Sequence, residues 1–249
     1  MVFKNATSFI EEKKQLMQWD IETLKKDLAP DIRLSYITSL GGYAKDIAFG
    51  YAILKNKAEA LSWFREAVGY YVKVDELLKE EGKRIRYVHA LRLLDAVVPL
   101  SKEEEYIKVA AIIEGLPPEP VPGTSYISSE LFEAYLDNMA PLLKGNYNEA
   151  LERLPRLRNS EKKDWKDCQF YEGLSDAIEG IAKQDKDLFL GGLNRVLEIF
   201  KRRNAQLKGL PICPEATTLF ILVKRRGMDI KLEDIDGKLR EFVPGVLVE

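Results

Sequence analysis

The sequence predicts an all-α protein of about ten helices that pair as antiparallel hairpins. Apolar residues recur at helical spacing along almost the whole chain. Capping residues, prolines and glycines bound most of these segments at positions where helices begin and end. The one run with the composition of a buried strand, 217–223, is itself bounded by helix signals. We therefore do not expect a sheet.

Pro30 separates the first two expected helices. Ser8 and Glu11 have capping-box spacing, so the first helix is expected to begin there and to stop before Pro30. The second helix, 31–55, contains several small residues, which cost helix stability but permit close approach by a neighbouring helix. We therefore expect the second helix to be central.

Three more helices complete the first half of the chain. The third follows the polar corner 55–57, and the fourth ends at Pro99. Ser101 and Glu104 form a second capping-box pair, which opens a fifth helix that Gly115 closes.

The stretch 115–128 contains four prolines and two glycines, so it cannot extend either neighbouring helix. It is interpreted as a loop within a single all-helical domain, 1–249. This loop joins an N-terminal half, 1–114, to a C-terminal half, 129–249.

Four helices are expected to follow the loop. They run from Ser128 or Ser129 to about Lys144, over 146–158, from Ser160 onward, and from a cap at Asp185 onward. Pro141 is expected to kink the first of them or end it early, and Pro155 to disturb the second.

The last expected helix, 214–226, carries the strand-like run. Pro214 suits a first helical position, and Gly227 suits a left-handed helix exit. Glu215 at the start and the Lys-Arg-Arg run at 224–226 complement the helix dipole. Because β-branched propensity is a weaker signal than these, we expect a helix that is buried on more than one side.

Three helix corners resemble one another, at 49–64, 139–154 and 178–193. Each has an apolar helix end, a short polar turn and a second helix that begins with small residues. The second corner contains Gly-x-Tyr-x-Glu-Ala-Leu and resembles the tetratricopeptide (TPR) pattern. Because the corners do not keep the 34-residue tetratricopeptide period, we expect degenerate hairpins, in an irregular helical bundle or a TPR-like array.

Composition excludes several classes of function. The 38 basic and 40 acidic residues leave a net charge of −2, which gives no general attraction for nucleic acid or an anionic membrane. The N-terminal residues lack the pattern of a signal peptide, and no apolar run is long enough to span a membrane. We therefore expect a cytoplasmic protein with reduced cysteines.

Basic residues form three clusters, at 83–86, 201–203 and 224–226. Together they could bind phosphate if they converged in space. Two of the clusters fall near predicted helix ends, where they complement the helix dipole without any ligand. Nucleic-acid binding is therefore not expected.

The sequence contains no recognisable catalytic constellation, so no enzyme, cofactor or metal site is expected. His89 is the only histidine, which excludes a metal site with two histidines. It lies in an apolar helical run and is interpreted as a packed or rim residue. Cys213 precedes a helix N-terminus, where a thiolate is favoured. A buried small side chain is the preferred interpretation, and a nucleophile paired with His89 is the enzymatic alternative.

The run PEATTLFILVKRRGMDI, followed by FVPGVLVE, resembles the C-terminal part of the immunity protein 49 family. The segment AILKNKAEALSWFREA resembles the helical middle of the same family. The resemblance implies an all-helical, non-catalytic immunity protein that neutralises a cognate bacterial toxin by direct binding. The alternative is a TPR-like scaffold that binds a peptide or protein in a groove.

Exposed aromatic and acidic residues outside the core pattern are the candidates for partner contact. Tyr126 lies in the Pro-rich loop and Tyr147 at a helix corner. Glu172, Asp176 and Glu179 share one helical stripe, which could bind a cation or a basic partner. Each of the five also has the ordinary interpretation of a solvated surface residue.

Overall fold

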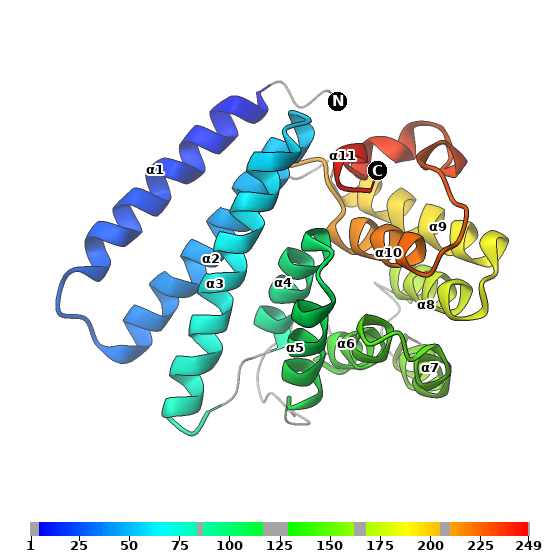
Figure 1. Ribbon diagram of the computed structural model, residues 1–249, viewed down its shortest axis with the longest axis horizontal. Coiled ribbons are helices and arrows are strands. Elements are labelled where there is room, and N and C mark those ends of the chain that lie inside the picture. Colours follow the sequence, from blue (N-terminus) through cyan, green and yellow to red (C-terminus); the bar gives the residue numbers. More distant parts are fainter. Residues whose placement is uncertain (1–4, 84–86, 117–128, 162–167, 205–209, 249) are drawn as a thin grey trace.

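Every regular element in the described part of the chain is a helix, as the sequence predicts (Figure 1). The computed structural model describes residues 5–83, 87–116, 129–161, 168–204 and 210–248. These ranges hold eleven α-helices and three 3-10 helices, and no β-strand. The α-helices are α1 (Ala6–Leu24), α2 (Pro30–Ile53), α3 (Lys57–Glu80), α4 (Tyr87–Val97), α5 (Glu103–Glu114), α6 (Ser129–Leu143), α7 (Tyr147–Glu161), α8 (Cys168–Lys183), α9 (Lys186–Asn204), α10 (Pro214–Arg225) and α11 (Gly245–Val248). The 3-10 helices are η1 (Val98–Leu100), η2 (Leu232–Asp234) and η3 (Gly237–Phe242).

Most helices pack against their neighbours in the chain and so form an array of hairpins. Helices α1, α2 and α3 lie side by side, and contacts continue from each helix to the next as far as α9 (Figure 1). Helices α4, α6 and α8 also contact one another in turn. Helix α10 departs from this order, because it packs against α4, α8 and α9 and thereby joins the two halves of the array.

One apolar core runs through the array. Its buried side chains extend from Ile10 in α1 to Val248 in α11. A smaller cluster of Ile37, Val74 and Leu78 lies between α2 and α3. Within the described ranges, no helix is both long enough and apolar enough to cross a membrane.

Helix α10 is buried along its whole middle. All side chains over 216–223 are buried, so the strand-like composition of this run reflects packing on every side. The hydroxyl of Thr217 donates to the Cys213 carbonyl at 2.9 Å, which satisfies a polar group inside the core. Pro214 begins the helix, and Gly227 follows it with a φ of +82°, as the sequence predicts.

Three hairpin corners share one construction. At each corner a residue with positive φ ends one helix, and the next residue, Asn or Asp, caps the following helix. The pairs are Lys55–Asn56, Gly145–Asn146 and Gln184–Asp185. In each pair the backbone N–H of the cap donates to the carbonyl five residues earlier, at 2.8 to 2.9 Å. The three corners, which resemble one another in sequence, therefore also share one backbone conformation.

Helix α1 begins and ends earlier than the sequence predicts. Asn5 is its cap, because the Asn5 side chain accepts a hydrogen bond from the Ser8 backbone N–H at 3.1 Å. The predicted capping box at Ser8 is therefore wrong. The helix ends at Leu24, and Pro30 occupies the first turn of α2 instead of stopping α1.

Two further helix starts differ from the prediction. Ser101 has a φ of +53° and caps no helix, and three glutamates in the first turn of α5 complement the helix dipole instead. Ser160 lies in the last turn of α7, and α8 begins at Cys168. Trp165, which the sequence places in this helix, lies outside the described residues.

Pro141 lies inside α6, which nevertheless continues to Leu143. A proline cannot donate to the carbonyl four residues before it, so the Asp137 carbonyl loses its helical partner. The Arg153 guanidinium of α7 donates to this carbonyl at 3.1 Å and replaces the lost bond. The neighbouring helix therefore makes the proline tolerable.

Helices α8 and α9 approach closely where both have glycine. A Cβ atom on Gly192 would lie 2.5 Å from the backbone N of Ala177 and 2.5 Å from the Gly173 carbonyl oxygen. These are backbone atoms, so only a shift of one helix could relieve the overlap. Gly191, the adjacent residue, has open space at the same position.

We expect Gly192→Ala to destabilise the protein by about 1 to 3 kcal/mol, because it forces α8 and α9 apart. Gly191→Ala is the matched control, and a helix-interior alanine there is expected to be neutral or to stabilise by up to about 1 kcal/mol. Urea unfolding of the two variants measures the difference. Equal midpoints would contradict the close helix contact.

The corners predict a second pair of opposite effects. A non-glycine residue in the left-handed region costs about 1 to 2 kcal/mol. Gln184→Gly should therefore raise the free energy of unfolding, and Gly145→Gln should lower it by a similar amount. Thermal unfolding of both variants tests the shared corner geometry, and shifts of the same sign would disprove it.

Candidate functional site

The predicted acidic stripe on α8 is part of an ion-pair network between helices. Asp176 binds Arg158 of α7 at 3.2 Å and Arg195 of α9 at 2.8 Å. Glu179 also pairs with Arg158, and with Lys183 of its own helix. The hydrogen bond from Lys183, together with the charge of Arg158, lowers the pKa of Glu179.

This network leaves little of the stripe for a partner. Asp176 and Glu179 are half-buried and neutralised by neighbouring helices, whereas Glu172 is exposed. The described residues contain no group of three or more His, Cys, Asp and Glu side chains that could hold a metal ion. The structure thus gives Asp176 and Glu179 a role in joining α7, α8 and α9.

Of the two tyrosines predicted to contact a partner, only Tyr147 lies within the described residues. Tyr147 is half-buried at the start of α7, where the Arg226 guanidinium lies 3.7 Å from its ring centroid and covers one face. Arg158, which binds the acidic stripe, lies eleven positions further along α7, or about 16 Å along the helix, so Tyr147 does not join the stripe. Tyr126 lies outside the described residues.

The surroundings of Cys213 do not favour the thiolate that the enzymatic alternative requires. Cys213 is fully buried at the N-cap of α10. Burial raises the pKa of its thiol well above the usual value, and the nearby Glu215 carboxylate raises it further. A reactive cysteine needs the opposite shift. His89 is half-buried on α4.

A buried ion pair links α2 to α4. Lys45 lies 3.2 Å from Asp95, whose other oxygen, Oδ1, has no hydrogen-bond partner among the described residues. Burial raises the pKa of Asp95 to about 7; Lys45 and Arg92 oppose this shift, and Glu215 adds to it. This pair is not among the residues that sequence patterns single out. The available signal was one carboxylate inside the apolar run 93–98.

We expect Asp95→Asn to change how stability depends on pH. The folded-state pKa of Asp95, about 7, lies above its unfolded value of about 3.9. Folding therefore takes up a proton between these values, and the stability that Asp95 contributes falls as pH rises through this window. The variant should make the free energy of unfolding decline less steeply between pH 5 and 7.

Urea unfolding at several pH values measures this slope. Asp27→Asn, which removes an exposed carboxylate between α1 and α2, is the control. An Asp95→Asn slope equal to that of the unmodified protein would show that Asp95 titrates outside this window.

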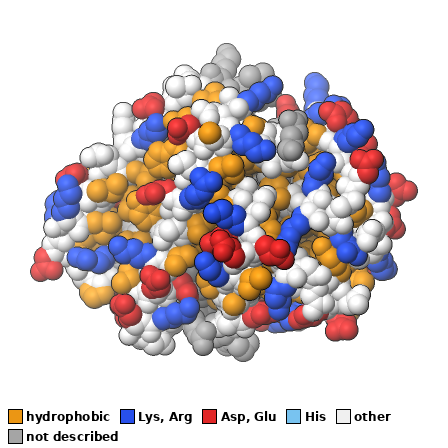
Figure 2. All heavy atoms as spheres, viewed as in Figure 1, with side chains coloured by type: hydrophobic (Ala, Val, Ile, Leu, Met, Phe, Trp, Pro, Cys, Tyr) orange, Lys and Arg blue, Asp and Glu red, His pale blue; other side chains and the backbone are white. Residues whose placement is uncertain are grey.

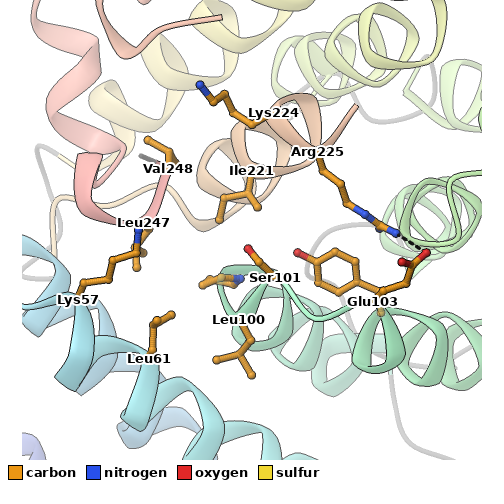
Figure 3. Close-up of a pocket in the computed structure, with 12 residues that line it drawn as sticks. Lys57, Leu61, Leu100, Ser101, Glu103, Ile221, Lys224, Arg225, Leu247 and Val248 are labelled. Atoms are coloured by element: carbon orange, nitrogen blue, oxygen red, sulfur yellow. Dashed lines mark hydrogen bonds and ion pairs between the residues drawn. The ribbon is translucent and has the colours of Figure 1, made fainter. Parts of the chain in front are cut away.

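A groove of about 520 Å³ lies where four separate parts of the chain meet. The first turns of α3, the segment from η1 into α5, the C-terminal half of α10, and α11 form its walls (Figure 3). Its apolar lining consists of Leu61, Pro99, Leu100, Ile221, Leu247 and Val248. Its polar lining consists of Lys57, Ser101, Glu103, Tyr106, Lys224 and Arg225. On the face in Figure 2, basic and acidic side chains meet over apolar ones near the centre.

Arg225 is held in place at one side of the groove. Its guanidinium donates to the Leu143 carbonyl at 2.6 Å and to Glu103 at 3.3 Å, and lies 4.6 Å from the Tyr106 ring centroid. The Tyr106 hydroxyl in turn donates to the Val98 carbonyl at 2.6 Å. Because three groups fix Arg225, its position is preorganised.

Two lysines complete the polar lining. Lys57 reaches from the first turn of α3 toward Leu247 of α11 (Figure 3), and no carboxylate among the described residues lies within ion-pair distance of it. Lys224 turns toward the rim, where its ammonium donates to the Ile230 carbonyl at 3.4 Å. With Arg225 paired to Glu103, the described residues that line the groove carry more positive than negative charge.

The basic cluster 224–226 therefore does more than end α10. Lys224 and Arg225 lie in its last turn, as the sequence predicts, and Arg225 also ties α10 to α5 and α6. The cluster 201–203 ends α9. Arg84 and Arg86 of the third cluster lie outside the described residues.

The protein is an array of helical hairpins in which helix α10 packs across α4, α8 and α9. No family model matches the chain, and no curated protein or solved structure matches it either.

Proposed function

We propose that this chain is a non-catalytic immunity protein that neutralises a cognate bacterial toxin by binding it directly. The observation that supports this proposal best is the groove, which joins an apolar lining to Lys57, whose ammonium has no carboxylate partner within the described ranges. Apolar area bordered by fixed polar groups is typical of protein-binding sites. The resemblance of the α10 sequence to the immunity protein 49 family is the reason for proposing a bacterial toxin as the partner.

The state of the ionisable groups favours binding over chemistry. Burial holds the Cys213 thiol neutral, and basic side chains of neighbouring helices neutralise Asp176 and Glu179. These groups are occupied in maintaining the fold. None of them combines a shifted pKa with exposure in the groove, which is the usual mark of a catalytic group.

A TPR-like scaffold is the second candidate, because the three corners share one construction and successive helices pack in series. Such scaffolds bind partners along an extended concave surface. Here α10 packs against α4, α8 and α9, so the chain covers these helices with its own segment. Beside α10 the chain has a short groove, which suits one compact contact with a partner better than an extended bound peptide.

We expect the purified protein to form a complex with the product of a toxin gene that neighbours its coding sequence. Toxin activity should fall in proportion to the protein added and vanish at a fixed molar ratio, because a binder acts stoichiometrically. Gel filtration and titration of residual toxin activity measure both effects. Progressive inactivation by a substoichiometric amount would indicate an enzyme, and full toxicity without a complex would refute the proposal.

A further inference from the structure

The lining of the groove specifies which part of a protein partner it accepts. We infer that the groove binds a short acidic segment, with a carboxylate at Lys57 and a large apolar side chain against the η1, α10 and α11 surface. This inference rests on the proposed protein-binding function and assigns it a site and a ligand chemistry.

The apolar requirement follows from shape and composition. Leu61 and Leu100 are half-buried, so each presents apolar surface to the groove, and Leu100 also packs against the core. Ile221 of α10 and Leu247 of α11 also line the groove. The volume of about 520 Å³ lies within the range of clefts that bury most of a small ligand. It suits a few side chains of an anchoring segment.

The acidic requirement follows from charge. Of the residues that the structure describes, three basic side chains and one acidic side chain line the groove, although the whole chain has a net charge of −2. Lys57 is the first residue of α3, where the partial positive charge of the helix end adds to its own. Complementary charge of this kind selects an acidic partner and excludes a basic one.

Arg225 offers a second contact for the same segment. Its present partner, the Glu103 side chain, is 75% exposed, so water already competes for this ion pair. The Leu143 carbonyl and the Tyr106 ring hold the guanidinium independently of Glu103. A partner carboxylate can therefore replace Glu103 without moving Arg225.

Selection from a random peptide library displayed on phage tests the ligand chemistry without a known partner. The intact chain should enrich peptides in which Asp or Glu lies beside Leu, Ile, Phe or Trp. Lys57→Glu should lose this enrichment. Its fold should persist, because an acidic residue in the first turn complements the helix dipole, and thermal unfolding checks this point.

Lys73→Glu is the matched control. Lys73 is exposed on the same helix, about 24 Å from Lys57 along the axis. A synthetic consensus peptide should bind Lys57→Glu about tenfold more weakly than Lys73→Glu, by fluorescence anisotropy. Its affinity for the unmodified protein should fall as salt increases.

Three results would overturn the inference: no enrichment, enriched peptides without acidic residues, or equal affinity for the two variants. Toxin titration keeps this failure distinct from failure of the proposed function. If Lys57→Glu neutralises the toxin as well as the unmodified protein, the groove is not the contact site although the function stands. If the unmodified protein does not neutralise it, the function fails whatever the peptide selection gives.

Discussion

The packing of α10 against both halves of the array is the interaction on which the rest of the structure depends. Its run 216–223 is buried on every side, which requires neighbours all around it. Helix α4 supplies one side, and α8 and α9 supply another. Without this helix, apolar surface of both halves would face solvent, at a cost of about 25 cal/mol for each Å² exposed. The single core from α1 to α11 therefore depends on one central segment.

The groove is a consequence of how this buried helix ends. The last turn of α10 leaves the core and carries basic residues. These residues interact favourably with the negative end of the helix dipole and with groups of neighbouring helices. Arg225 reaches the C-terminal carbonyl of α6, which gives a partner to a group that helix ends commonly leave exposed. The same residues that terminate the helix thus form a rigid polar edge beside an apolar wall.

Local signals predicted those features that local interactions determine. Asp185 caps α9 as expected, and the Pro214 and Gly227 boundaries of α10 are confirmed, because each depends on residues within one turn. The α1 cap was missed because Asn5 and Ser8 both have capping side chains, and short-range sequence does not rank them.

Features assembled from distant segments could not be predicted in this way. The stripe of Asp176 and Glu179 was recognised, but the arginines that neutralise it come from α7 and α9, whose placement depends on packing. Lys45 and Asp95 are fifty residues apart in sequence, and only the crossing of α2 and α4 brings them together. The groove is lined by residues from four segments that are distant in sequence. Each segment contributes only a few residues, and none of these short runs has a pattern that indicates a binding site.

The order of helices along the chain has a consequence for synthesis on the ribosome. The three corners use bonds between residues a few positions apart, so the hairpins they join can form as soon as they emerge. Helix α10 emerges after all of α1 to α9, and until then the surfaces of α4, α8 and α9 that it covers stay open. The nascent protein thus passes through a stage in which the hairpins have formed but the apolar surfaces that α10 later covers are exposed to solvent. At this stage chaperone binding competes with aggregation.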